Sequence, residues 1–218
     1  MDASEFFFKS SKNYDYSPTI RLVKDYVVAI ETKSCSDDDD KQVGNGVIIG
    51  DLLITAGHVV KDCKDAKFIF NANGTTLKQD SLEKLYECYI VNPGEYDLAI
   101  YRVPGINTPY VLSSKRPING QILRSESIDT YNMKPTICNA EVKGYKEDLG
   151  LYFRVDTDKS LVEGCSGSPL FDGNEVFGII VRGNNDGKGN KNSPDDPLNL
   201  CFALSSTAIL DVIDKLKL

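Results

Sequence analysis

A histidine, an aspartate and a serine lie in three separate segments whose residue types suit acyl transfer. His58 is the only histidine of the chain and ends an apolar run, while Asp97 stands at the head of another. Histidine is the side chain that takes up and releases protons near neutral pH. Ser166 lies in a glycine-rich turn, residues 164–167. A base that activates a serine hydroxyl, with a carboxylate to orient the base, is what nucleophilic acyl transfer needs.

The elements that must position these residues are mainly strands. Short segments rich in Val, Ile, Tyr and Phe alternate with Gly, Asn, Asp and Pro, which is typical of an all-β protein. The last segment, 205–218, instead places apolar residues on one helical face, and Ser205, Ser206 or Thr207 is available as its cap. Expected strands cover residues 26–31, 46–49, 52–55, 66–70 and 98–103, then 121–124, 136–145, 151–155, 169–171, 176–181 and 200–204.

The proline-bounded stretch 107–117 divides the strands into two sets. We therefore expect an N-terminal arm at 1–20, a first unit at 21–108, a second unit at 109–204 and a helix at 205–218. His58 and Asp97 fall in the first unit and Ser166 in the second. The site would then form only where the two units meet.

In chain order, these motifs resemble the trypsin-like (chymotrypsin-fold) serine proteases, bacterial and viral members included. The resemblance rests on Thr55-Ala56-Gly57-His58, Asp97-Leu98-Ala99-Ile100 and Gly164-x-Ser166-Gly167-Ser168-Pro169, with the strand 178–183 in support. It covers roughly residues 27–218. The fold it implies is all-β, two six-stranded antiparallel β-barrels followed by a C-terminal α-helix.

The resemblance also implies roles for individual residues in a serine endopeptidase. His58 would be the base, Asp97 its orienting group and Ser166 the nucleophile, with the backbone N–H groups of Gly164 and Ser166 as the oxyanion hole. The substrate would be a polypeptide, and no metal or organic cofactor is expected. The walls of the substrate pocket would include Ser160, Val181, Arg182 and Gly183.

Ser160 stands where trypsin-type enzymes keep an aspartate, so a strong preference for Lys or Arg is not expected. Arg182 near the pocket mouth would either attract an acidic side chain or extend into solvent. Gly183 is expected to pair with the backbone of an extended substrate.

Cys165 occupies the place where zymogen-forming relatives hold an aspartate that pairs with a freed N-terminus. That activation device is therefore absent here, which leaves constitutive activity or activation by a protein partner. The thiol itself has two interpretations: a site where oxidation or alkylation disturbs the oxyanion turn, or a buried and inert side chain.

Two other functions fit parts of the pattern. A catalytically silent module that binds peptides would need the same fold, although it has no reason to keep all of His58, Asp97 and Ser166. An esterase would use the same three groups on small acyl esters. The α/β-hydrolase version is disfavoured because its histidine comes last rather than first in the chain.

Composition limits the classes of binding partner and the cellular compartment that we expect. The formal net charge of −7 and a pI near 4.8 give no electrostatic support for binding nucleic acid. The first residues lack the basic start and long apolar stretch of a secretory signal, and no segment is long enough to span a membrane. The six cysteines have no short paired spacings, which disfavours zinc and favours free thiols and a cytoplasmic protein.

Overall fold

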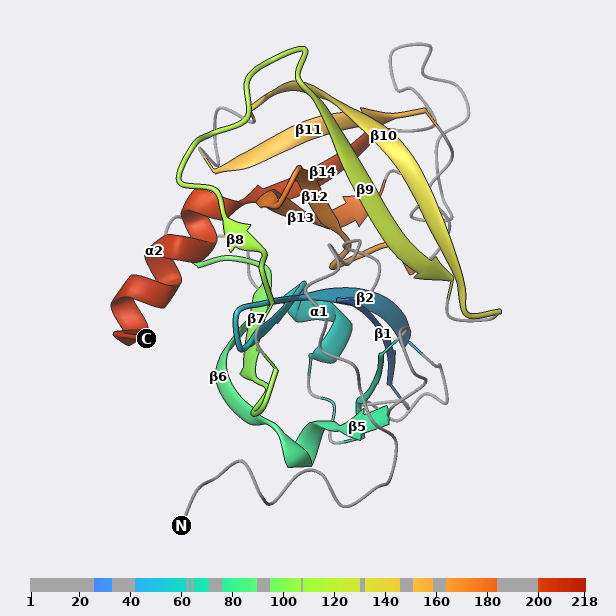
Figure 1. Ribbon diagram of the computed structural model, residues 1–218, viewed down its shortest axis with the longest axis vertical. Helices are drawn as coiled ribbons and strands as arrows, with labels where there is room; N and C mark the ends of the chain where they lie inside the picture. The colour runs from blue at the N-terminus through green and yellow to red at the C-terminus, as the bar shows by residue number, and fades with distance from the viewer. Residues whose placement is uncertain are drawn as a thin grey trace.

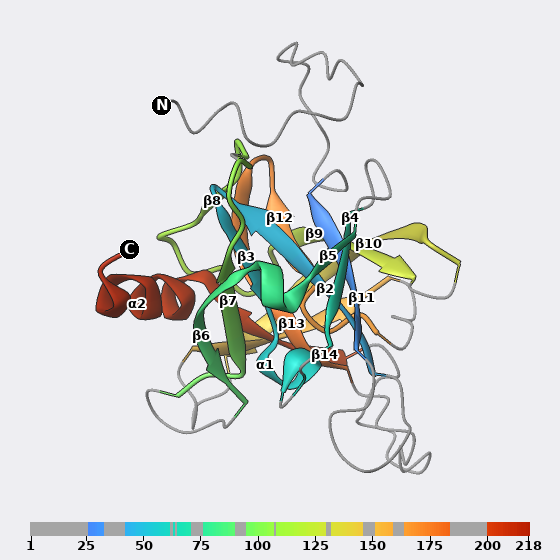
Figure 2. The ribbon, with the colours of Figure 1, turned by 90° about the horizontal axis from the view of Figure 1, so that it is seen from below.

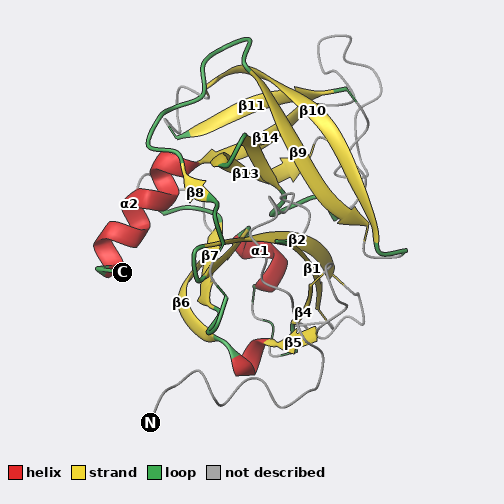
Figure 3. Cartoon of the chain, in the orientation of Figure 1, coloured by secondary structure: helices red, strands yellow, loops and turns green. Residues whose placement is uncertain are grey.

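The computed structural model describes residues 26–32, 42–61, 63, 65–70, 76–89, 95–106, 108–129, 132–145, 151–158, 164–183 and 200–218. Strands dominate these residues, and helices are few and short (Figure 3). The predicted all-β class is therefore confirmed. The predicted N-terminal arm at 1–20 lies outside the described residues.

The first half forms one antiparallel sheet of seven strands in the order β5-β4-β1-β2-β3-β7-β6. Figure 1 shows this sheet curling into a ring, with the short helix α1 at the end of β3. The 3-10 turn Gln79–Ser81 connects β5 to β6. The elements are β1 Val27–Thr32, β2 Gln42–Ile49, β3 Leu52–Thr55, α1 Gly57–Val60, β4 Lys67–Phe70, β5 Thr76–Lys78, β6 Glu83–Cys88 and β7 Leu98–Arg102.

The second half is a closed barrel. Six antiparallel strands follow one another as β12-β9-β10-β11-β14-β13, and β12 also pairs with β13, which closes the ring. β8 adds to β13 in parallel on the outside. The strands are β8 Val111–Leu112, β9 Ile122–Asp129, β10 Lys134–Tyr145, β11 Tyr152–Thr157, β12 Pro169–Asp172, β13 Glu175–Gly183 and β14 Leu200–Ser205.

The predicted C-terminal helix is α2, Ser206–Leu216, which projects from one side of the two sheets (Figure 2). It begins at Ser205, whose side chain accepts a hydrogen bond from the N–H of Thr207 and so satisfies one free donor of the first turn. Ala208, Ile209 and Val212 form its buried face, and the helix packs against β8, β13 and β14.

Two apolar clusters hold the molecule together. One fills the second barrel. The other lies inside the curled first sheet and continues across the contact between the halves, where Ile128, Tyr152 and Phe171 of the second half join it. Each buried aliphatic or aromatic side chain contributes about 1.5–3 kcal/mol. The shared cluster therefore fixes how the two halves sit on each other.

The double-barrel fold is confirmed, with differences in strand number. The first sheet has seven strands rather than six, and among the described residues no pairing joins its edge strands β5 and β6. Three strands were not predicted, namely β5, β6 and β8. β6 mixes charged and apolar residues because it is an edge strand with partly exposed side chains.

The expectation that the cysteines are free thiols is wrong for Cys63, which takes part in a disulfide, whereas Cys88, Cys138, Cys165 and Cys201 are not disulfide-bonded. The cysteines therefore no longer indicate a reducing compartment. Among the described residues, no helix is both long and apolar enough to cross a membrane.

Candidate active site

His58 is carried by α1, a four-residue helix that starts directly after β3. The helix can lie this close to β6 and β7 because residue 57 is glycine. A Cβ at Gly57 would overlap the carbonyl oxygen of Cys88 and touch the N–H of Leu98. The glycine directly before His58 is thus required by packing.

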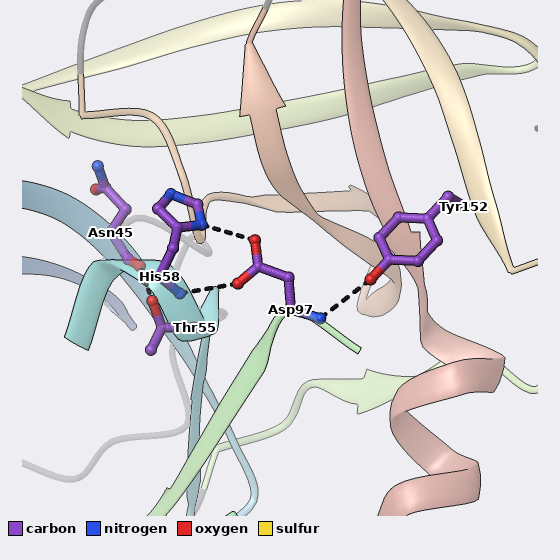
Figure 4. A network of polar contacts seen from close by, with 5 residues as sticks. All are labelled: Asn45, Thr55, His58, Asp97 and Tyr152. Atoms are coloured by element: carbon purple, nitrogen blue, oxygen red, sulfur yellow. Dashed lines mark hydrogen bonds and ion pairs between the residues drawn. The ribbon is translucent and has the colours of Figure 1, made fainter. Parts of the chain in front are cut away.

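His58 and Asp97 form a close pair through two hydrogen bonds. His58 Nδ1 lies 2.7 Å from Asp97 Oδ2, and the backbone N–H of His58 donates to Asp97 Oδ1 at 2.8 Å. Both carboxylate oxygens therefore face one residue, as Figure 4 shows. Since a carboxylate only accepts, the neutral ring carries its proton on Nδ1 and leaves Nε2 free to accept another.

The pair differs in exposure, with side-chain values of 43% for His58 and 10% for Asp97. The imidazole can thus be reached from solvent while the carboxylate that orients it is buried. Asp97 is held from the opposite half as well, because its N–H donates to the hydroxyl of Tyr152 on β11 at 3.0 Å (Figure 4). Burial raises the pKa of Tyr152 to about 12, so this hydroxyl stays neutral at ordinary pH.

Ser166 lies in the turn between β11 and β12. Gly164 and Gly167 on either side have φ of +91° and +87°, which side chains rarely adopt. The turn is fixed by hydrogen bonds from Gly167 N to Ile180 O, 2.6 Å, and from Ser168 N to Cys165 O, 3.0 Å.

The serine turn is also bound to the first half. The N–H of Asn45 on β2 donates to the carbonyl oxygen of Ser166 at 2.7 Å. A Cβ at Gly167 would overlap the Asn45 carbonyl oxygen, and one at Gly44 would collide with Val59 and approach Ser166 O. Gly44 thus lies between the helix that carries His58 and the turn that carries Ser166.

His58 and Asp97 are hydrogen-bonded to each other directly. The turn that carries Ser166 is bound to β2, the strand beside β3, and β3 leads into the helix that carries His58. Among the described residues, no hydrogen bond links the His58 ring to Ser166. Contacts between a nucleophile and its base are often long without substrate and shorten when substrate binds.

The residues expected in the substrate pocket are only partly described. Ser160 lies outside the described residues. Val181 is buried in β13 within an irregularity of the strand, and Arg182 and Gly183 pair with Phe202 and Cys201 of β14. The preference for a substrate side chain therefore stays a prediction.

Cys165 is buried beneath the turn. Loss of contact with water raises the pKa of its thiol to about 11, so very little of the reactive thiolate is present at neutral pH. This favours the inert interpretation of Cys165. Among the described residues, no group of three or more His, Cys, Asp or Glu side chains is placed to hold a metal ion.

Sequence reasoning missed two residues of the site, Asn45 and Tyr152. Asn45 could have been identified from the sequence, because it is a polar residue between two glycines in a buried apolar strand. Such a residue must find hydrogen-bond partners within the protein. Tyr152 could not have been identified in this way, because tyrosine is a common residue in strands.

The chain is similar to known proteases in both sequence and fold. A family model, the trypsin-like peptidase domain, matches residues 44–179. The fold resembles the Rv3671c protease of M. tuberculosis in its active form, with a TM-score of 0.67 and 18% identity, over 89% of this chain and 82% of that one.

A serine endoprotease from Yersinia pestis gives a TM-score of 0.64 at 19% identity, over 89% of this chain and 63% of that one. No curated protein matches the sequence. At such identities the solved structures establish the fold alone, whereas the family model spans well over half of the chain. The chain therefore belongs to the trypsin-like peptidase domain family.

Proposed function

We propose that this protein is a serine endopeptidase that uses His58, Asp97 and Ser166. The observation that carries the proposal is the pair of hydrogen bonds between His58 and Asp97, 2.7 and 2.8 Å, beside a serine turn bonded to the adjacent strand. Family membership supports the same conclusion.

In the first step, Ser166 Oγ attacks the carbonyl carbon of the peptide bond while its proton passes to His58 Nε2. Asp97 holds the ring by Nδ1 and stabilises the imidazolium that forms. The carbonyl oxygen becomes negative, and the N–H groups of Gly164 and Ser166 are the proposed donors to it. Each such donor lowers the barrier by about 3–4 kcal/mol.

The tetrahedral intermediate then breaks its C–N bond, and His58 returns the proton to the leaving amine. Water attacks the remaining ester by the same route, with His58 again taking a proton and then giving it to Ser166 Oγ. Every proton moves through His58; the peptide C–N bond of the polypeptide substrate is cut in the first half of the reaction, and the ester bond to Ser166 Oγ is cut in the second.

A fluorophosphonate probe tests this chemistry without a known substrate. Attack by Ser166 forms an O–P bond and releases fluoride, and the proton passes to His58. We expect one adduct by intact mass on the wild type, with none on Ser166→Ala and at least a hundredfold slower labelling of His58→Ala.

Ser168→Ala is the matched control. Ser168 lies in the same turn and is fully buried, and its hydroxyl has no hydrogen-bond partner among the described residues. Its removal should leave labelling within about twofold of the wild type. Folded wild type that gives no adduct would contradict activity of the chain on its own, and would favour a silent peptide-binding module or an enzyme that needs an activating partner.

A further inference from the structure

Asn45 is the most constrained polar residue at the contact between the two halves. Its side chain has no exposed surface although it lies in β2 among apolar residues. A buried amide costs stability unless its donors and acceptor are used. All of them are used here, and on groups that belong to the second half.

The amide of Asn45 binds two backbone segments. Its Oδ1 accepts from the N–H of Ile128 at 2.7 Å, and its Nδ2 donates to the carbonyl of Ile128 at 3.2 Å. The same Nδ2 donates to the carbonyl of Gly164 at 2.7 Å. One side chain thereby connects β9 to the turn that carries Ser166.

The backbone of Asn45 extends this connection in both directions. Its N–H holds the carbonyl of Ser166 at 2.7 Å, and its own carbonyl accepts from Thr55 Oγ1 at 2.6 Å. Thr55 is the last residue of β3 and stands three positions before His58. Figure 4 shows it beside Asn45. Asn45 therefore contacts the segments that carry the proposed nucleophile and the proposed base.

These bonds fix the turn at both ends. Gly164 has φ of +91°, and glycine with its wide conformational freedom cannot hold its own peptide planes in one orientation. With the Gly164 carbonyl bound to Asn45 and the Ser166 carbonyl bound to the same residue, the turn keeps one conformation. These bonds fix the peptide planes 164–165 and 166–167, and the plane between them carries the Ser166 N–H. That N–H is then oriented before substrate arrives, which is what oxyanion stabilisation needs.

We propose that Asn45 is a positioning residue, whose amide holds the oxyanion turn in register with His58. The proposal rests on the function proposed above, since it assigns a task to Asn45 in the reaction of Ser166. It does not require Asn45 to touch the substrate.

Asn45→Asp is the sharpest test because it keeps the shape of the side chain and the acceptor for Ile128 N–H. An ionised carboxylate has no N–H for the Gly164 carbonyl. We expect fluorophosphonate labelling to slow at least tenfold, and amide hydrogen exchange in a peptide covering 164–168 to accelerate. Asn45→Ser, which shortens the side chain without adding charge, should do the same if the aspartate variant fails to fold.

Thr108→Val is the matched control, because Thr108 is buried and its hydroxyl bridges Ile48 O and Gly50 N within the first half, each at 3.0 Å. It should lose stability but keep the labelling rate and the exchange of residues 164–168. Folded Asn45 variants with wild-type exchange in that peptide would overturn the proposal, as would labelling slowed equally in Thr108→Val. Wild type that cannot be labelled would contradict the proposed function instead, and the exchange measurement would still decide whether Asn45 holds the turn.

Discussion

At the scale of single residues, Tyr152 supports Asp97, the proposed orienting carboxylate, from the opposite half of the molecule. Tyr152→Phe would leave the buried N–H of Asp97 without its acceptor. An unsatisfied buried donor costs about 1–3 kcal/mol. We expect that loss in the free energy of unfolding by urea, together with slower fluorophosphonate labelling, because Asp97 would hold His58 less firmly.

Tyr101→Phe separates the two effects. Tyr101 is also fully buried, and its hydroxyl accepts from Gln79 Nε2 at 3.0 Å within the first half, away from Asp97. Its removal should lower stability and leave labelling unchanged. If both variants slowed labelling equally, the support of Asp97 by Tyr152 would be purely structural.

Whether a site residue could be predicted from the sequence depended on the kind of group that it binds. His58 and Asp97 could be paired in advance because a single histidine and a carboxylate before an apolar strand suggest one role each. Asn45 and Tyr152 could not, since their partners are backbone groups 119 and 55 positions away. Backbone groups carry no residue identity, so a sequence does not reveal which of them a side chain will bind.

At the scale of elements, strands with apolar character were predicted and small or mixed elements were not. α1, Gly57–Val60, has four residues, too few for helical periodicity, and no helix was predicted there. β5 and β6 carry exposed polar residues because they form the edges of the first sheet. Edge strands lose the apolar pattern by which strands are found.

Two glycines in turns allow a matched test of how the turn that carries Ser166 packs against β2. Gly167 and Gly173 both have positive φ, +87° and +60°, so alanine at either costs about 1–2 kcal/mol in backbone conformation. Only at Gly167 would the new Cβ also overlap the Asn45 carbonyl and Thr55 Oγ1, while Gly173 faces open space. We expect Gly167→Ala to lose several kcal/mol more and to label much more slowly.

Unfolding in urea and the rate of fluorophosphonate labelling, measured on both variants, check this. Gly173→Ala should label like the wild type. Equal losses of stability in the two variants would mean that the turn does not lie against β2 as described.

At the scale of the whole molecule, two buried tyrosines should make stability depend on alkaline pH. Burial raises the pKa of Tyr101 and Tyr152 above the ordinary 10.0, to about 12 for Tyr152. The folded state therefore keeps these protons longer than the unfolded chain does. Their contribution is complete below pH 10 and is lost as pH rises through the folded pKa values.

Urea unfolding between pH 8 and pH 11 measures this effect. Each proton difference adds a slope of about 1.4 kcal/mol per pH unit, so the decline above pH 10 should be shallower when both tyrosines are phenylalanine. Identical slopes for wild type and the double variant would show that these hydroxyls ionise equally well in the folded and unfolded chains.

The arrangement of the halves was only partly predictable. The two strand sets and the C-terminal helix followed from apolar patterns and from the resemblance to trypsin-like proteases. The shared cluster at Ile128, Tyr152 and Phe171 did not, because an interface residue and a core residue are equally apolar in sequence. The second half of β9 was missed for a different reason, because its buried residues Ser125, Glu126 and Ser127 are polar.

The closure of the second barrel also sets when activity can first appear during synthesis. β14, residues 200–205, lies between β11 and β13, and β13 in turn holds the serine turn through Ile180 and Gly167. Domains fold progressively as they leave the ribosome. On the proposed function, a nascent chain that already displays His58 and Asp97 therefore stays inert until β14 has emerged and β13 has a partner on that side.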